Sequence, residues 1–521
     1  MSEIGIGSLG SILPEIILIV GGLLILLLDM IQNSTTYQRE SGRGFMAVAV
    51  LFLVVSLVGA LLQMLSFGSP TSQGPHVAAY LVDIDPFTSF MKMTIYIGMT
   101  LVAIAGGSYM NRYSPRMGRG EFWSLFLFTS MAMGMVVSAN NLILLFLSFE
   151  FLSISSYILA GYLRNNVRSS EAGLKYFLYG SVASSVMLYG MSLLYGVSGS
   201  LNLTEIAQAM AANTDFSIVA LPAVLMLMVG LGFKMTLAPF FQWAPDTYDG
   251  APTPVTAYLS TASKAAGFAV TARLLLIGLG AFSVEWVPVL SGLAILTMTV
   301  GNLMALRQNS VKRMLAYSSV AQAGYMLMGL VSVVSASHAE LSQIDLASLG
   351  MNGLNGLLIY LFAYLFTNIG AFMVVMAIEE DSGSHDISAY RGLMQRSPGL
   401  ALAMLIFLLS LTGIPLTGGF MGKFYVFGAA VQHQYFFLAA AGFINAGIAA
   451  GYYLRVVAAM IYEPAVDDNG VEIAPKPLNM GMALQLTLAI CVLVTLWIGI
   501  YPPNFIDLAN DASRHLLALR F

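Results

Sequence analysis

The chain has 521 residues, of which 58% are hydrophobic and only 9% are charged, and its formal net charge is −4. This composition excludes a water-soluble domain of such length, and the few scattered basic residues offer no patch for nucleic acid. One cysteine, Cys491, excludes iron–sulfur ligation by this chain, and the five histidines fall in loops or at run ends, which argues against haem.

Apolar runs of about 20 residues, the length that crosses a hydrocarbon core of about 30 Å, recur along nearly the whole chain. They predict an all-α, polytopic membrane protein with about 14 transmembrane helices. We expect the helices near residues 12–30, 45–66, 87–110, 122–138, 141–163, 172–197, 217–240, 254–279, 288–306, 314–335, 351–379, 399–430, 434–462 and 478–500.

Basic residues gather in alternate connections, and such an excess marks the cytoplasmic side of a membrane protein. They are Arg39 and Arg43 after the first helix, Arg112, Arg116 and Arg119 after the third, Arg164 and Arg168 after the fifth, Arg307, Lys312 and Arg313 after the ninth, Arg391 and Arg396 after the eleventh, and Lys476 after the thirteenth. The pattern predicts that both termini are outside. Two places depart from it: the link after the seventh helix has no positive charge, and the C-terminal tail carries Arg514 and Arg520.

Four charged side chains fall deep inside the predicted helices: Glu150, Lys234, Lys264 and Lys423. A charge at the bilayer centre costs about 2.5–3.5 kcal/mol on insertion scales, so it normally faces the protein interior and has a polar partner. Glu150 is the only carboxylate in its run and could neutralise one of the lysines. We therefore favour a functional role for these residues over a purely structural ion pair.

Two of the lysines adjoin segments that cannot continue as regular helix. FFQWAPDTYDGAPTP follows Lys234, and LTGIPLTGGFMGKFYVF contains both Pro415 and Lys423. Helices broken at membrane depth are tolerated where they line a cavity, and the carbonyls freed beside Pro239 and Pro415 could serve the lysines. Because the segments lie about five helices apart, helices 4–8 and 9–13 are predicted to be inverted five-helix repeats with helices 7 and 12 broken.

This repeat predicts four divisions of the chain. They are an N-terminal three-helix segment at residues 1–115, a first repeat at 116–284, a second repeat at 285–465, and a final helix with a tail at 466–521.

Several other charged residues have simpler interpretations. Lys92, Arg273 and Arg455 lie near run ends, where their side chains are expected to snorkel to the membrane interface. Lys175 follows Glu171 by four residues, so an ordinary i,i+4 ion pair and a functional role are equally open.

The remaining polar candidates fit structural roles at least as well as transport. Asp246 and Asp249, in the first break, suit the capping of a half-helix as well as proton handling. The amides expected to join helices by hydrogen bonds are Asn302, Asn355, Asn368 and Asn445.

Residues 230–268, GLGFKMTLAPFFQWAPDTYDGAPTPVTAYLSTASKAAGF, closely resemble the signature of the antiporter-like subunits of proton-pumping NADH:quinone oxidoreductase, respiratory complex I. The resemblance extends through NSVKRMLAYSSVAQAGYMLMGL and GIPLTGGFMGKFYVF and covers roughly helices 4–13. The W-x-P-D-x-Y-x-G-A-P-T-P form is typical of the subunit N branch rather than the L and M branches or the Mrp-type sodium/proton antiporter subunits.

The resemblance implies that five residues translocate protons. Glu150 and Lys234 would form the pair between helices 5 and 7, Lys264 the central group of helix 8 and Lys423 the group of helix 12, while Lys175 matches a family lysine on helix 6.

One position departs from the family pattern. Gln322 stands where some relatives have histidine, which puts a titratable relay there in doubt. A hydrated hydrogen-bonding role stays open for this amide.

The main hypothesis is therefore a proton-translocating subunit of a quinone oxidoreductase, a translocase driven by quinone reduction elsewhere in the complex. An Mrp-type antiporter subunit is the alternative, and a non-transporting scaffold is third. We expect no cofactor or metal on this chain, which lacks a G-x-G-x-x-G after a strand, whereas the complex would use FMN, iron–sulfur clusters and a quinone.

The expected surroundings follow from the same resemblance. The partners would be lipids and the other membrane-arm subunits, including sister antiporter-like subunits and the small subunits toward the quinone module. We expect the bacterial plasma (inner) membrane, with the thylakoid membrane as the alternative, and the electron donor is open between NADH and ferredoxin.

Overall fold

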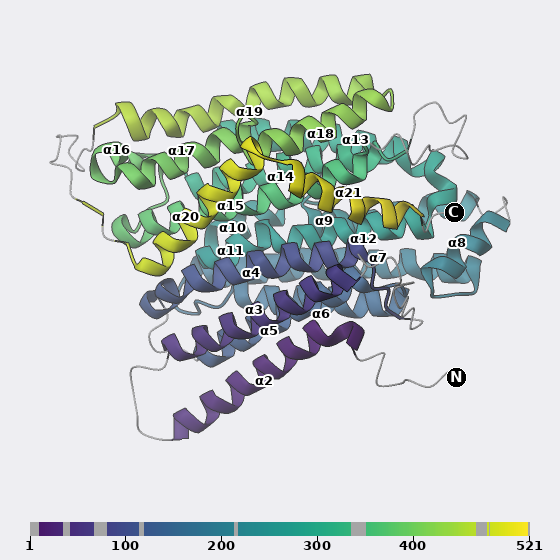
Figure 1. The fold of residues 1–521 in the computed structure, drawn as a ribbon, viewed down its shortest axis with the longest axis horizontal. Helices are drawn as coiled ribbons and strands as arrows, with labels where there is room; N and C mark the ends of the chain where they lie inside the picture. Colours follow the sequence, from purple (N-terminus) through teal and green to yellow (C-terminus); the bar gives the residue numbers. More distant parts are fainter. Residues whose placement is uncertain are drawn as a thin grey trace.

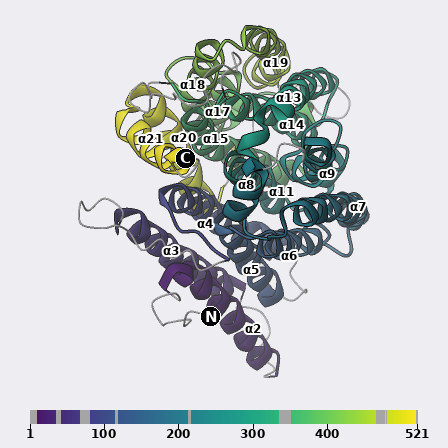
Figure 2. The same cartoon turned by 90° about the vertical axis from the view of Figure 1, so that its right-hand side faces the viewer.

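The computed structural model describes residues 10–34, 42–66, 81–113, 119–212, 217–334, 351–464, 477–478 and 480–518. Of the basic residues counted above, Arg39, Arg116, Lys476 and Arg520 lie outside these ranges. The described chain is an all-α bundle whose long helices run side by side (Figure 1). Viewed along the helices, α2 and α3 lie at one edge and α19 at the opposite edge (Figure 2).

The helices of ten or more residues have the following bounds. They are α2 (Leu13–Ser34), α3 (Gly42–Ser66), α4 (Pro86–Tyr113), α5 (Arg119–Ser138), α6 (Leu142–Ala160), α7 (Val167–Ser198), α8 (Leu203–Ala212), α9 (Ser217–Met235), α12 (Ala262–Arg273), α13 (Ser283–Leu306), α14 (Val311–Val331), α15 (Gly353–Ser382), α17 (Pro398–Thr412), α18 (Gly418–Gln432), α19 (Phe436–Tyr462), α20 (Met482–Ile500) and α21 (Pro503–Ala518).

Three shorter helices complete the set: α10 (Trp243–Gly250), α11 (Thr253–Ser260) and α16 (Leu393–Arg396). By length and composition, 11 helices of the described chain are able to cross a membrane, and two shorter apolar helices accompany them at Leu221–Met235 and Pro398–Thr412. The chain is thus a polytopic membrane protein.

Both predicted breaks are present. α9 ends at Met235, Thr236 takes a left-handed φ of 61°, and α10 begins only at Trp243. α17 ends at Thr412 and α18 begins at Gly418. Proline and glycine in these segments stop the regular hydrogen-bond ladder, as their backbone limits require.

One helix that was predicted to be continuous is interrupted. The segment expected as a single helix near 254–279 is divided into α11 and α12 at Thr261, whose φ and ψ are −124° and −82°. The hydroxyls of Ser260 and Thr261 both donate to the Ala257 carbonyl, at 2.9 and 2.7 Å. Such side-chain bonds to the backbone compete with the helical ladder, and hydropathy does not report them.

Two helices of ten or more residues were absent from the sequence prediction because they are too short or too polar to appear as apolar runs. α8 is a short helix that packs against η3 (Leu274–Gly278), the segment that follows α12. α21 is an amphipathic helix that packs on α4 and α15. Phe505 of α21 stacks on Phe362 with ring centroids 4.3 Å apart.

α14 occupies the centre of the bundle. Apart from Arg313 it is buried along its length, and it packs against α10, α13, α15, α18 and α19. α2 and α3, by contrast, keep many large apolar side chains exposed, as lipid-facing helices do. Polar side chains on α14 therefore lie away from lipid and can contact the helices that surround α14.

The expectation of snorkelling was wrong for two of the three residues. Lys92 is fully buried and its Nζ lies 2.8 Å from the carboxylate of Glu15, which also accepts the Tyr96 hydroxyl at 3.1 Å. Arg273 is buried against the carboxylates of two residues that precede α4, at 3.1 and 2.7 Å. Each cation pairs with a carboxylate that is distant in sequence, so its charge is balanced inside the protein rather than at the membrane interface.

The buried Lys92–Glu15 pair generates a stability prediction. Lys92→Met leaves the Glu15 carboxylate buried without its cation, so we expect a loss of about 3–5 kcal/mol of unfolding free energy, seen as a lower Tm in detergent. The double variant Lys92→Met/Glu15→Gln should recover much of this loss, because neither charge then remains.

The control is Glu463→Gln, which breaks the half-exposed Arg391–Glu463 pair and should cost less than about 1 kcal/mol. Equal Tm values for Lys92→Met and Glu463→Gln would contradict the prediction.

Candidate functional site

Lys234 lies in the last turn of α9, directly before the first break, and is 2% exposed. Its Nζ donates to the hydroxyls of Ser153 on α6 and Tyr176 on α7, both at 3.3 Å. The Tyr176 ring is in turn stacked on Trp243 of α10, with centroids 4.1 Å apart. The break thus supports the aromatic partner of Lys234, and hydroxyl groups take the place of the carbonyls expected beside Pro239.

Glu150 lies on α6, three residues before Ser153, so the two side chains share one face of the helix. Its Oε1 is buried without a hydrogen-bond partner. Among the ion pairs of the described residues, none joins Glu150 to Lys234. Glu150 therefore lies one helical turn along α6 from the Ser153 hydroxyl that accepts from Lys234, without an ion pair to that lysine.

Lys264 is fully buried on α12, where its Nζ donates to both the carbonyl and the hydroxyl of Ser319 on α14, at 2.5 and 2.6 Å. Gly267, one turn further along α12, faces Lys234: a Cβ at this glycine would lie 3.6 Å from Lys234 Cγ. Lys234 therefore lies against the stretch of α12 that carries Lys264.

Lys423 depends on the second break. Its Nζ donates to the carbonyls of Leu411 and Thr412, both at 2.9 Å, and lies 4.7 Å from the ring centroid of Tyr325. The last carbonyls of a helix have no intrahelical partner and carry the negative end of its dipole, so the end of α17 is a ready cation site. This confirms the carbonyl partners expected beside Pro415.

Polar groups on α14 connect the surroundings of Lys264 and Lys423. Gln322 donates through Nε2 to the Leu411 carbonyl at 2.9 Å, the same oxygen that accepts from Lys423, and to the Tyr453 hydroxyl at 3.2 Å. The Tyr453 hydroxyl also bonds to Ser318 at 2.5 Å, next to the Ser319 that holds Lys264.

Only Gln322 of this group was singled out from the sequence, and its hydrogen-bonding role is what the structure shows. The participating serines carry no signal in an apolar helix, because a serine there commonly bonds to its own backbone. The tyrosines carry none either, because the sequence does not show which distant group a tyrosine hydroxyl will meet. The Tyr360 hydroxyl, which donates to Gln322 Oε1, was missed for the same reason.

Lys175 belongs to a different cluster at one end of the bundle. The predicted i,i+4 pair with Glu171 is confirmed at 2.6 Å, and Lys175 also pairs with Asp246 at 2.7 Å. Asp246 bonds in addition to Arg313 of α14, at 2.7 Å. The side chain of Lys175 is 37% exposed, so it stands apart from the three buried lysines.

The amides predicted to join helices do so. Asn302 donates to Asn445 across α13 and α19, and Asn368 donates to the Ser260 hydroxyl at 2.8 Å. Asn355 donates to Asn510 of α21 at 2.6 Å.

Comparison with known proteins identifies the family of this fold. Residues 139–449 match the family model described as "NADH:quinone oxidoreductase/Mrp antiporter, TM". The chain is 37% identical over 515 residues to NADH-quinone oxidoreductase subunit N of Trichlorobacter lovleyi, an alignment that covers 97% of each protein. The chain belongs to the subunit N family of NADH-quinone oxidoreductases.

Solved structures agree with this assignment. A chain of respiratory complex I from Thermus thermophilus superposes with a TM-score of 0.74 and 29% identity, covering 95% of this chain and 99% of that one. A chain of the Mrp complex from Dietzia sp. superposes with a TM-score of 0.81 but only 20% identity, covering 97% and 96%. The Mrp likeness is one of fold, and the sequence relationship places the chain with subunit N rather than with the Mrp alternative.

The contact between Gly413 and Lys423 gives a prediction for this subunit N family member. Gly413 has a φ of +92°, and a Cβ there would lie 2.8 Å from Lys423 Cδ. Gly413→Ala should push the ammonium away from the α17 carbonyls and lower proton pumping by the complex by up to about 100-fold, as small misplacements of a reacting group can. Pumping in reconstituted vesicles measures this.

Gly199→Ala is the matched control, because Gly199 has a φ of +70° and a Cβ there would meet no other part of the described chain within 4 Å. It should show only the backbone strain of the left-handed region, about 1–2 kcal/mol, with pumping retained. Equal pumping by both variants would show that the position of Lys423 is unimportant.

Proposed function

We propose that this subunit translocates protons along the row Lys234, Lys264 and Lys423, as part of the membrane arm of the oxidoreductase. The observation that carries the proposal is the nature of the lysine partners. Hydroxyl and carbonyl oxygens, all neutral, hold the three ammonium groups.

The contrast with two other buried cations, Lys92 and Arg273, gives this observation its meaning. Lys92 and Arg273 are each held by carboxylates, which keep a buried base charged. Burial without a carboxylate favours the neutral amine, so each lysine of the row can gain or lose its proton when a nearby charge moves. A lysine held in a pair with a carboxylate stays charged and does not exchange its proton in this way.

Charges along the row are then able to influence one another. Two unit charges at about 4 Å with an effective dielectric of 20 interact by ~4 kcal/mol, enough to change the protonation of a neighbour. When the Glu150 carboxylate approaches, Lys234 is held as ammonium; when it withdraws, the proton can pass toward Lys264. Lys175, paired with two carboxylates, would tune the charges at the Lys234 end of this row rather than carry the proton in its interior.

We further propose the finer architecture on which the row depends. If α9 with α10, α11 with α12, and α17 with α18 each count as one broken span, the chain has about 14 spans. Helices 4–8 and 9–13 would then be inverted repeats at residues 116–284 and 285–465, between an N-terminal segment at 1–115 and a C-terminal part at 466–521. The matched breaks support this division.

The surroundings of the subunit follow from its family. We propose that it assembles with sister antiporter-like subunits and with small subunits toward the quinone module, in the bacterial plasma membrane, with a thylakoid membrane as the alternative. FMN, iron–sulfur clusters and quinone would belong to other subunits of the complex, and quinone reduction there would drive the charge movements described above.

The first test separates proton transfer from mere charge. Lys234→Ala removes the ammonium, whereas Lys234→Arg keeps a cation that does not release its proton. Both variants should lower proton pumping and coupled quinone reductase activity by at least about tenfold, because both abolish proton exchange at this site.

The subunit content of the purified complex controls for assembly and should be unchanged. Normal pumping by Lys234→Arg would show that only a fixed charge is needed. Normal pumping by both variants would support a scaffold without transport.

The second test concerns Glu150. Glu150→Gln removes the charge that favours the ammonium form of Lys234, so pumping should fall about tenfold, the effect of about 1.4 kcal/mol on a protonation equilibrium. Glu150→Asp keeps the charge and should retain part of the activity. If the Gln and Asp variants pump equally well, Glu150 acts only as a packing residue.

A further inference from the structure

A polar cavity of about 670 Å³ opens at the end of the bundle where the connections between helices meet. Its walls come from the end of α4, the α6–α7 connection, the α10–α11 link, the start of α14 and the segment after α15. Most of these segments carry the basic residues that mark the cytoplasmic side. The cavity therefore faces the compartment from which protons would be taken up.

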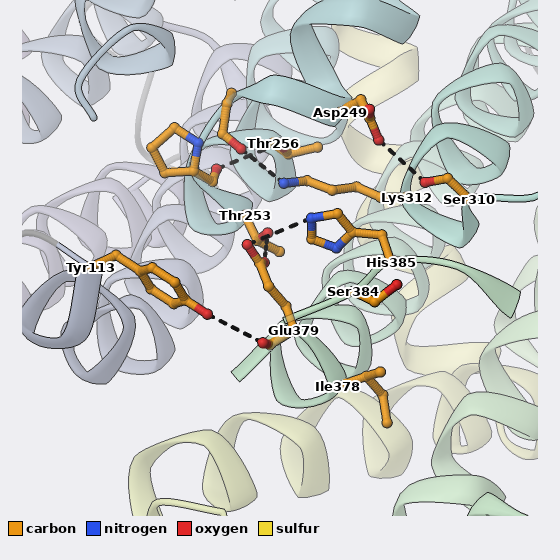
Figure 3. A network of polar contacts seen from close by, with 12 residues as sticks. Tyr113, Asp249, Thr253, Thr256, Ser310, Lys312, Ile378, Glu379, Ser384 and His385 are labelled. Atoms are coloured by element: carbon orange, nitrogen blue, oxygen red, sulfur yellow. Dashed lines mark hydrogen bonds and ion pairs between the residues drawn. The ribbon is translucent and has the colours of Figure 1, made fainter. Parts of the chain in front are cut away.

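Glu379, near the end of α15, is the most heavily bonded carboxylate in this cavity. It accepts the Tyr109 hydroxyl at 2.8 Å. It also accepts the Thr253 hydroxyl at 2.5 Å, and His385 Nε2 lies 3.6 Å from its Oε1 (Figure 3). Glu379 is 8% exposed, whereas His385 is half-buried at the cavity wall. The pair thus joins a water-accessible imidazole to a nearly buried carboxylate.

Two elements lead from the cavity to Lys264. Thr253, the partner of Glu379, is the first residue of α11, which continues through α12 to Lys264. Lys312, the buried cation of the cavity wall, lies on α14 seven residues before Ser319, which holds Lys264. Seven residues are two helical turns, about 10.5 Å, so both side chains occupy one face of α14.

Lys312 is held in a way that keeps it apart from Glu379. Its Nζ donates to the Ala251 carbonyl at 2.8 Å, and no ion pair joins it to a carboxylate among the described residues (Figure 3). An ammonium at Lys312 would oppose a proton on the cavity wall without locking the Glu379 carboxylate in an ion pair. This arrangement favours passage of the proton over its retention.

We propose that Glu379 and His385 form the loading site at which a proton from the cytoplasmic side enters the row of buried lysines. The inference rests on the proposed function and names where its protons come from. A hydronium ion in the cavity gives its proton to the Glu379 carboxylate and leaves as water. The carboxylic acid then releases that proton through water toward the free amine of Lys264, which becomes ammonium.

Charged and titratable groups face the pair from every adjoining element. They are Arg112, Tyr109 and Tyr113 on α4, Arg168 on α7, Asp249 on α10, Lys312 on α14, Glu380 on α15, and Asp386.

Burial, followed by the Lys312 charge, lowers the pKa of His385, which leaves the imidazole neutral near neutral pH. A neutral His385 leaves Glu379 free to take up a proton.

The test uses the intact complex in inside-out vesicles, whose outer face is the cytoplasmic one. Glu379→Gln should lower proton pumping by at least about tenfold, because an amide does not carry the proton. It should also abolish the dependence of the pumping rate on external pH that wild type shows, while Glu379→Asp keeps that dependence. A purely structural Glu379 would change assembly but not the pH profile.

Asp381→Asn is the matched control. Asp381 lies two residues from Glu379 on the same helix end, outside the cavity wall, and pairs with Arg396. It should pump with the wild-type pH profile. Wild-type pumping and pH dependence in Glu379→Gln would overturn the inference, and the proposed function would still stand if Lys234→Arg had lost pumping in the same vesicles.

A second measurement tests the side of the membrane without relying on turnover. The native thiol of Cys491 is buried, so Ser384→Cys, at the cavity wall, provides the one reactive cysteine of this chain, and labelling is read on this subunit alone. A membrane-impermeant maleimide should label it in inside-out vesicles and leave it unlabelled in right-side-out ones. The opposite pattern would overturn the inference.

Discussion

An ammonium group inside the bilayer must replace its water by protein groups, and the choice of those groups decides what the lysine can do. In this subunit five buried cations show two kinds of choice. Lys92 and Arg273 are held by carboxylates and tie helices together. Lys234, Lys264 and Lys423 are held by neutral oxygens, which solvate the ammonium without fixing its charge.

The helix breaks supply or position such oxygens. An uninterrupted helix uses its carbonyls for its own backbone, whereas the end of α17 leaves those of Leu411 and Thr412 for Lys423. The break after α9 acts indirectly, since it places Trp243 where the indole stacks on Tyr176 and fixes the hydroxyl that meets Lys234. The same device, a broken helix beside a lysine, thus provides two different solvation shells.

The features predictable from the sequence are those that are rare in a membrane helix. Charges such as Lys264 and prolines such as Pro415 are costly at that depth, so their presence alone predicted buried lysines and broken helices. The hydroxyls that complete the site, such as Ser319 and Tyr453, are common in apolar helices and were not predictable. Only packing against α14 reveals which of them face a lysine.

The Lys92–Glu15 pair was missed for another reason. The two residues are far apart in sequence, and each lies near the end of its own apolar run, where snorkelling is the ordinary outcome. The division of α11 from α12 was missed because one residue, Thr261, takes a non-helical backbone that hydropathy does not report. Long-range pairing and single-residue geometry therefore mark the limit of the sequence argument.

α14 shows why the central helix of such a bundle is polar on the inside yet still a membrane helix. Along its length it presents Lys312 to the cavity, Ser319 to Lys264, Gln322 to the carbonyl that binds Lys423, and Tyr325 to Lys423 itself. The order of these contacts in space follows their order in the sequence, because one helix carries them all. A proton that enters at the cavity and leaves past Lys423 would therefore keep to the side of a single buried helix, to which the second broken helix brings Lys423.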